Sequence, residues 1–372
     1  MNAIRVAALW ALALSLASCG GGTSSPSPPA ITQHIAYVAD EAGSSVSAYA
    51  IAGTTGSLTP ISGSPFMING GATSIAIAPG GKVALLAFGS SIVGSVSAYL
   101  IDPANGTLRL GTGSPLAAGL GASSLVVDPT GRFTYTANFF SNNVSGFSVD
   151  ASTGALATIP GGPFPAGANP TALVIDPSGK FVYAANHGGG ISGYSIDATT
   201  GALNPLAGSP FGAAPSQFSM TIDPSGKYAF VTIDPNAVGG FILVDSIDPS
   251  THALTQFATI LAVSNPTALA FVPSGRFFYV ASAVNPSANG ALYGYSFDPA
   301  TGAFAPISGG PYTTGQFPAC ITIDSSGKFA YIANVTSNNV SGFSIDSATG
   351  ALTSIAGSPF ADGSVPVSIA IK

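Results

Sequence analysis

The sequence predicts an all-β protein: a seven-bladed β-propeller with four-stranded antiparallel blades, closed by pairing of the C-terminal strand into the N-terminal blade. Three observations predict it: a turn motif that recurs about every 50 residues, four short strands in each period, and two chain ends that hold complementary parts of one period. The composition agrees, because 46% hydrophobic residues can form a core while 47 Gly and 29 Pro supply many turns.

The recurring motif is the turn Asp-Pro-Ser-Gly-Lys or a close variant of it. Its glycine falls at Gly81, Gly131, Gly179, Gly226, Gly275 and Gly327, so successive copies lie 47 to 52 residues apart. Units of this length occur in propellers and also in helical repeats. The apolar runs here are short, rich in β-branched and aromatic residues and without a 3.6-residue rhythm, which favours strands.

The segment 171–206 shows how one blade is built. Three strands are expected at 171–175, 181–185 and 191–196, and a fourth begins at residue 202. Turns rich in Asp, Gly, Ser and Thr separate them, as hairpins between antiparallel strands require. Each period therefore predicts one antiparallel sheet.

The two chain ends determine the number of blades. Residues 35–40 correspond to a second strand and have no first strand before them, while residues 367–371 correspond to a first strand with nothing after it. Six whole repeats and this composite one make seven blades, and only their outer edges stay exposed. The motif Gly-Ser-Pro-Phe and its variants occur six times and place a proline, which has no N–H, on expected outer strands, where it discourages edge-to-edge aggregation.

The N-terminus has the features of an export signal. Residues 1–18 combine one basic position with an apolar run too short to cross a membrane, and they end in Leu-Ala-Ser before Cys19. This ending resembles the lipobox of bacterial lipoproteins, which implies that Cys19 is lipidated, and the following Gly20 implies sorting to the outer membrane. We expect a signal peptide at 1–18, a lipidated flexible tether at 19–34 and the propeller at 35–372.

The net charge and the cysteine content limit which molecules the protein is expected to bind and which bonds it is expected to form. The net charge is −6, so nucleic acid and anionic membrane surfaces are not expected to bind, and the membrane is contacted through the lipid anchor alone. With Cys19 acylated, Cys320 is the one remaining thiol and is expected to be a small buried residue in a strand. The sequence contains neither a phosphate-binding glycine loop nor zinc-ligand spacing, so we expect no cofactor and no metal.

The repeats resemble a known family. The run Asp-Pro-Ser-Gly-Lys-Phe-Val-Tyr-Ala-Ala-Asn that begins at Asp176, followed by Ser-Ile-Asp-Ala-Thr-Thr-Gly-Ala-Leu from Ser195, is similar to repeats of the seven-bladed lactonase family, and the similarity covers 35–371. That family includes relatives of 6-phosphogluconolactonase and carboxymuconate cyclase, and the surface-layer Tyr-Val-Thr-Asn repeat propellers are also similar. The resemblance implies a lactone hydrolase or cycloisomerase activity, although the matching residues are turns and core strands.

The resemblance also implies that the first strand of each blade descends from a ligand-bearing upper face, which places the two recurring turns on the lower face. Sixteen charged residues occupy fixed positions of these lower turns, where an aspartate usually caps its own turn. The upper loops are left with Asp40, Glu41, His187, Asp234, Asp362 and, less clearly, Asp245. Because no lysine or arginine is among them, a phosphorylated lactone is not the expected substrate.

His187 is the best candidate for a general base, because its ordinary pKa lies near neutral pH and the glycines after it allow a ligand to approach. The alternative is an ordinary solvated loop histidine. Asp40, Glu41 and Asp234 are weaker candidates to assist it. Three residues that end second strands, Asn138, Asn186 and Asn334, together with Asp40, are expected to form an upper polar ring that either satisfies loop backbone or binds ligand.

Two functions therefore remain open. The side chains favour a binding or scaffold propeller at the cell envelope, a monomer that holds a small neutral ligand or an envelope protein through its upper loops. The resemblance favours a lactone hydrolase or cycloisomerase for a weakly charged substrate, with His187 as the base.

Overall fold

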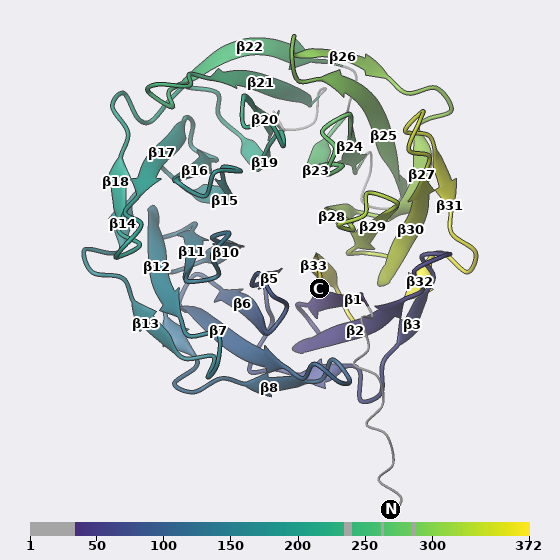
Figure 1. The fold of residues 1–372 in the computed structure, drawn as a ribbon, viewed down its shortest axis with the longest axis horizontal. Helices are drawn as coiled ribbons and strands as arrows, with labels where there is room; N and C mark the ends of the chain where they lie inside the picture. The colour runs from purple at the N-terminus through teal and green to yellow at the C-terminus, as the bar shows by residue number, and fades with distance from the viewer. Residues whose placement is uncertain (1–33, 234–239, 262–263, 284–287) are drawn as a thin grey trace, which may run out of the picture.

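The computed structural model describes residues 34–233, 240–261, 264–283 and 288–372, which form a ring of seven antiparallel sheets around a central axis (Figure 1). The sheets are numbered here as blades 1 to 7 in chain order. Within each blade, strands run from the axis outward, and this arrangement confirms the predicted seven-bladed propeller.

The first four blades are built from the following strands. Blade 1 contains β33 (Pro366–Ile371), β1 (Ile35–Asp40), β2 (Ser45–Ile51), β3 (Leu58–Pro60) and β4 (Phe66–Met67). Blade 2 contains β5 (Ser74–Ile77), β6 (Val83–Gly89), β7 (Gly94–Ile101), β8 (Leu108–Leu110) and β9 (Leu116–Ala117). Blade 3 contains β10 (Ala122–Val127), β11 (Phe133–Asn138), β12 (Asn143–Val149), β13 (Leu156–Thr158) and β14 (Phe164–Pro165). Blade 4 contains β15 (Pro170–Ile175), β16 (Phe181–Asn186), β17 (Ile191–Ile196) and β18 (Leu203–Pro205).

The remaining blades follow the same order. Blade 5 contains β19 (Gln217–Ile222), β20 (Tyr228–Ile233), β21 (Phe241–Ile247) and β22 (Leu254–Ile260). Blade 6 contains β23 (Pro266–Phe271), β24 (Phe277–Ser282), β25 (Asn289–Asp298), β26 (Ala303–Pro306) and β27 (Tyr312–Gln316). Blade 7 contains β28 (Pro318–Ile323), β29 (Phe329–Asn334), β30 (Asn339–Ile345), β31 (Leu352–Ser354) and β32 (Phe360–Ala361).

The ring closes through its two chain ends, as the sequence predicts. The C-terminal strand β33 pairs antiparallel with β1, with Ala36 opposite Ile371 and Val38 opposite Ile369. The composite blade 1 thus gains its innermost strand from the other end of the chain, and the inner edge of β1 is paired.

The outer strand differs from the single fourth strand that the sequence predicts. In blade 1, both β3 and β4 pair with β2, and the turn between them carries the Gly-Ser-Pro motif. The Ser64 hydroxyl accepts the N–H of Ala48 at 2.8 Å, and Ser358 does the same for Gly342 at 2.9 Å. The strand breaks because the serine side chain takes over the amide that a continuous strand would have bound, and the proline has no N–H to donate.

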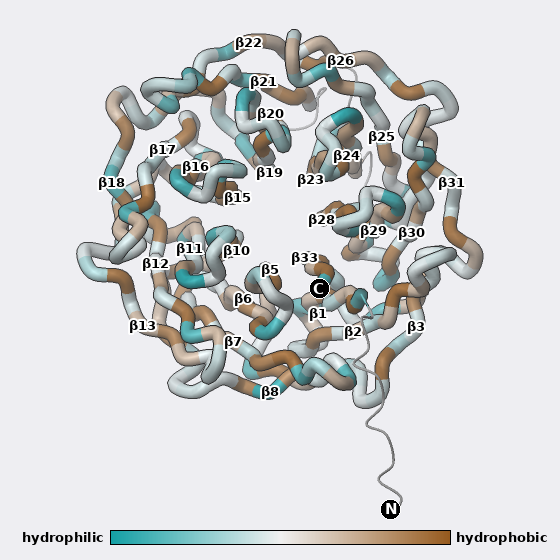
Figure 2. Tube along the Cα trace, viewed as in Figure 1, coloured by the Kyte–Doolittle hydropathy of each residue, from teal (hydrophilic) through white to brown (hydrophobic). Residues whose placement is uncertain are grey.

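The hydrophobic core lies between neighbouring blades. The described residues form seven buried clusters, each of which joins the facing sides of two adjacent blades. Figure 2 shows hydrophobic segments along the innermost strands such as β15, β28 and β33. The second strands are the most deeply buried, and every residue of β1, β11, β24 and β29 is buried.

In five of the seven blades, a buried tyrosine of the second strand connects the blade to the next. The hydroxyl of Tyr331 donates to the carbonyl of Gly56 at 2.6 Å, and that of Tyr135 donates to Gly201 at 2.7 Å. Both acceptor glycines have positive φ in the lower turn between the third and fourth strands of the following blade. Each of these tyrosine side chains can therefore stay buried, because its hydroxyl has a hydrogen-bond partner.

Inner-strand serines form a second set of links. The hydroxyl of Ser368 accepts the N–H of Ile75 at 3.2 Å, and Ser124 accepts that of Leu173 at 3.1 Å. These bonds run between the first strands of neighbouring blades, which no β ladder connects. They fix the position of adjacent blades relative to each other along the central axis.

The two faces of the ring differ in chemistry. The turn between the first and second strands lies at one end of the blade, which we call the lower face, and the hairpin between the second and third strands lies at the opposite, upper face. The lower turns hold the repeated charges, and Asp324 accepts the N–H of Phe329 at 2.7 Å, as the predicted turn-capping role requires. Seven exposed large hydrophobic residues lie on the upper face: Met67, Ile92, Val93, Leu120, Phe140, Phe218 and Leu261.

The tyrosine links generate a test of stability. Replacing Tyr331 with Phe removes the hydroxyl that bonds to Gly56 and leaves that carbonyl without this donor, so the free energy of unfolding should fall by about 1–2 kcal/mol. Equilibrium urea unfolding measures it. Tyr312→Phe is the matched control, since the Tyr312 hydroxyl is only 3.4 Å from its acceptor in an exposed bond. An equal loss in both variants would contradict the role of the buried link.

Candidate functional site

Upper-face hairpins are held by the crossover loops, the segments that join the outer strand of one blade to the inner strand of the next. Phe140 donates its N–H to the carbonyl of Leu120 at 3.1 Å, and His187 donates its N–H to Asn169 at 2.8 Å. Asn169 also donates from Nδ2 to the carbonyl of Phe139 at 3.0 Å. These contacts join the upper loops of blades 3 and 4 into one surface.

His187 lies on this surface, in the hairpin between β16 and β17. Its side chain is exposed, and its imidazole lies 6.2 Å from the ring of Phe139, centroid to centroid. The next loop is attached to it as well, since Ser216 donates its N–H to the His187 carbonyl at 2.8 Å. The predicted base is thus accessible to solvent and ligand beside an aromatic surface.

The carboxylates expected to assist His187 lie elsewhere. Asp40 and Glu41 belong to blade 1, whereas His187 belongs to blade 4, across the ring (Figure 1). Glu41 is exposed, and its N–H donates to Val365 at 3.0 Å. Asp234 and Cys19 lie outside the described residues. Among the residues that the structure describes, no group of three or more His, Cys, Asp or Glu side chains could hold a metal ion.

The residues of the expected polar ring are fully buried. Asn334 donates from Nδ2 to the Ser341 hydroxyl at 2.9 Å, and that serine accepts the N–H of Gly315 in the crossover loop at 3.2 Å. Asn186 with Ser192 repeats the arrangement in blade 4, and in blade 3 the Asn138 amide oxygen accepts the hydroxyl of Ser145, which accepts the N–H of Gly119. A side chain added at Gly315 would collide with Asn334. In this geometry the amides support the crossover loops from below, and a ligand would reach them only if those loops moved.

Asp40 occupies the same position in blade 1. It is fully buried, and both Ser45 and Ser47 donate their hydroxyls to its Oδ2, at 3.0 and 2.7 Å. Its Oδ1 is buried without a hydrogen-bond partner. Burial, and then the negative charge of Asp362, raise the pKa of Asp40 to about 7.

Asp362 was recognised in the sequence only as an upper-loop residue, and its contact with blade 1 was not predicted. Its Oδ1 accepts the hydroxyl of Tyr49 at 2.6 Å, while its Oδ2 is buried without a partner. The repeats contain one sign that Asp40 is unusual, because blades 3, 4 and 7 have Asn at the position where blade 1 has Asp40. Asn is the neutral counterpart of a protonated Asp, so this position suits an uncharged side chain.

One further buried acid is unrelated to this group. Asp245 lies on β21, where burial raises its pKa to about 6. Among the described residues, Cys320 is a free thiol; it is half-buried in β28, and burial raises its pKa, which disfavours the reactive thiolate.

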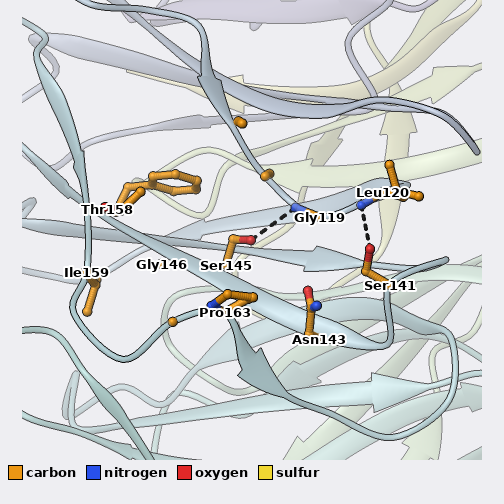
Figure 3. Close-up of a pocket in the computed structure, with 13 residues that line it drawn as sticks. Gly119, Leu120, Ser141, Asn143, Ser145, Gly146, Thr158, Ile159 and Pro163 are labelled. Carbon is orange, nitrogen blue, oxygen red and sulfur yellow. Dashed lines mark hydrogen bonds between the residues drawn. The ribbon is translucent and has the colours of Figure 1, made fainter.

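A groove opens on the upper face beside this surface (Figure 3). It has a cavity volume of about 390 Å³ and follows β12 between the crossover residues 117–120 and the outer turn 158–163. Ser141 accepts the N–H of Leu120 at 2.7 Å, and Ser145 accepts that of Gly119 at 3.2 Å, so both hydroxyls are engaged with the loop. The sequence offered no motif for this groove, because its walls come from two blades.

The lower face has larger cavities of different character. One of about 660 Å³ between blades 2 and 3 is lined by Lys82, Arg109 and Lys372 together with Asp102. The lysine and arginine side chains that line this cavity therefore lie on the lower face, opposite the upper face that carries His187. Within the described part of the chain, no helix is long and apolar enough to cross a membrane.

The buried acid generates a pH prediction. Since the pKa of Asp40 is about 7 in the folded protein and about 3.9 in an unfolded chain, the native state binds more protons between these values, and the free energy of unfolding should fall as pH rises from 4 to 7. Asp40→Asn should flatten this slope and be more stable than wild type at pH 8. Thermal unfolding across pH 4 to 9 measures both.

The control is Asp150→Asn, which changes an exposed turn whose hydrogen bonds, first of all that from Ser152, lower the pKa of Asp150 to about 2. It should leave the slope between pH 4 and 7 unchanged. A wild-type slope that persists in Asp40→Asn would show that another group is responsible.

Comparison with known proteins places this geometry in a family. The family model described as "Lactonase, 7-bladed beta-propeller" matches residues 25–163 and 308–369, more than half of the chain. No curated protein matches the sequence.

Solved structures share the fold at low sequence identity. A provisionally assigned 6-phosphogluconolactonase from Bacteroides fragilis has a TM-score of 0.76 and 20% identity, covering 93% of this chain and 99% of that one. One from Bacteroides uniformis has a TM-score of 0.75 and 18% identity, covering 91% and 99%. The periplasmic gluconolactonase of Pseudomonas aeruginosa has a TM-score of 0.74 and 18% identity, covering 91% and 99%. The chain belongs to the seven-bladed β-propeller lactonase family.

Proposed function

We propose that this protein is a ligand-binding propeller that holds an uncharged lactone, or a neutral molecule of similar size, on its upper face beside His187. The observation that carries the proposal is the accessible imidazole at the junction of blades 3 and 4, next to Phe139. The described upper loops contain no lysine or arginine, so a phosphate group would find no cationic donor there. A neutral ligand suits this surface better.

Hydrolysis of that lactone is the second candidate, and family membership favours it. His187 would accept a proton from water as the water oxygen bonds to the lactone carbonyl carbon; the ring C–O bond then breaks, and the leaving oxygen takes up a proton to give the hydroxy acid. The absence of Asp40 and Glu41 from this side of the ring leaves His187 without those partners. Binding is therefore the function that the geometry supports best.

The test uses glucono-δ-lactone, γ-valerolactone and 6-phosphogluconolactone with the whole protein. Calorimetry should show binding of the neutral lactones and at least tenfold weaker binding of the phosphorylated one. His187→Ala should weaken neutral-lactone binding about tenfold or more. His34→Ala, an exposed histidine at the lower end of β1, is the matched control and should bind as wild type does.

Product formation separates the two candidates. Binding without turnover supports a binding protein, whereas turnover that is lost in His187→Ala and kept in His34→Ala supports the hydrolase. Preference for the phosphorylated lactone, or equal binding by wild type and His187→Ala, would overturn the proposed site.

The location follows the sequence pattern at the N-terminus. We propose that residues 1–18 are removed and that lipid on Cys19 anchors the protein to the bacterial envelope, in the outer membrane. His34, where the described chain begins, lies at the lower end of β1, so such a tether would join the propeller at its lower face.

A single substitution tests the anchor. Cys19→Ser should move the protein from the membrane fraction to the soluble fraction of the cell, and wild type should carry the mass of a diacylglyceryl group that the variant lacks. Cys320→Ser, which changes the half-buried thiol of β28, should remain with the membrane. Membrane association of Cys19→Ser at the wild-type level would rule out lipidation at this residue.

A further inference from the structure

The groove along β12 is suited to an uncharged occupant. None of its thirteen lining residues is charged, and its walls include Ala117, Ala118, Phe147 and Ile159 (Figure 3). The cavities of the lower face differ, since they are lined by lysine, arginine or histidine together with aspartate, or by Arg276. Its volume of about 390 Å³ falls within the range of small-molecule sites.

The groove is continuous with the surface beside His187. Leu120 and Ser141 form its upper end, and the N–H of Phe140 donates to the Leu120 carbonyl at 3.1 Å. The rings of Phe140 and Phe139 are 5.1 Å apart, and the Phe139 ring is 6.2 Å from the imidazole of His187. An apolar path thus leads from the groove to the candidate base.

Parts of this path are exposed to solvent. Leu120 is 40% exposed and Phe140 is 51% exposed. Contiguous exposed apolar side chains are typical of binding sites, because contact with water is unfavourable for them and a ligand removes it. The polar hydroxyls of Ser141 and Ser145 already bond to loop backbone, so an apolar chain in the groove would not deprive them of partners.

We infer that the ligand is a lactone with an unbranched alkyl or acyl substituent, whose ring lies at His187 and whose chain lies across Phe139 and Phe140 into the groove along β12. This inference rests on the proposed function and adds the substrate class to it. The chain contributes affinity by burying methylene groups, and the ring supplies the polar part of the ligand.

The test is a series of 4-alkyl γ-lactones, from methyl to octyl, titrated into the whole protein by calorimetry. Each added methylene that enters the groove should lower the Kd by up to about fourfold until the groove is filled. Thr158→Trp places a large ring in the groove from an exposed position of β13, and it should abolish the affinity gained from the methylenes that reach the groove, while the methyl lactone still binds as to wild type.

Ser354→Trp is the matched control, because Ser354 pairs with Phe343 in blade 7 as Thr158 pairs with Phe147 in blade 3. It should preserve the chain-length dependence. Ala117→Phe, from the opposite wall of the groove, provides a second blocking variant if Thr158→Trp is not folded by circular dichroism.

The outcomes distinguish this inference from the proposed function. If short lactones bind and longer chains add nothing, or if the chain-length effect survives in both blocking variants, the groove is not the chain site and the proposed function stands. If no lactone of the series binds wild type, the inference fails, and binding of glucono-δ-lactone then decides whether the proposed function stands. Loss of the effect in the blocking variants with retention in Ser354→Trp supports the inference.

Discussion

The pairing of β33 with β1 is the contact on which the rest of the structure depends. A propeller blade buries its faces only against its neighbours, and the buried clusters on the two sides of blade 1 contain residues of β1 with Ile369 on one side and with Val367 and Ala370 on the other. Without β33, the inner strand of blade 1 would be missing and both clusters would open to water. The tyrosine and serine links between blades reinforce a ring that this one antiparallel ladder closes.

The same closure gives the lower and upper faces of the ring different side chains. Every blade runs in the same direction, so a residue at a given repeat position always reaches the same face. The lysines and aspartates of the recurring turns collect below, where Asp324 and its counterparts satisfy turn amides. The loops above are left with apolar side chains, His187 and few acids. The proposed preference for neutral ligands is a consequence of this division.

Asp40 in blade 1 shows how one repeat can differ from the others at a single position. Asn138, Asn186 and Asn334 support their crossover loops as neutral amides, while Asp40 occupies the same position in blade 1 as a buried acid near Asp362. A protonated Asp40 resembles the amides closely, so we expect the loop that leads into the closing strand to respond to pH near neutrality. The arrangement relates the stability of the ring junction to the charge of one side chain.

The sequence by itself determined the blade count and the closure, because turn spacing and strand periodicity are local properties that repeat in register, and the family resemblance implied the face on which the repeated charges lie. It also identified His187 as an upper-loop residue. Only the tertiary structure decided which candidates meet: His187 lies beside Phe139 and far from Asp40 and Glu41, the asparagines are buried, and Asp40 lies near Asp362, more than 300 residues away in sequence. Contacts between blades depend on how loops of different length pack across the ring, and no repeat pattern encodes them. For the same reason the groove along β12, whose walls come from blades 2 and 3, could not be found from the sequence.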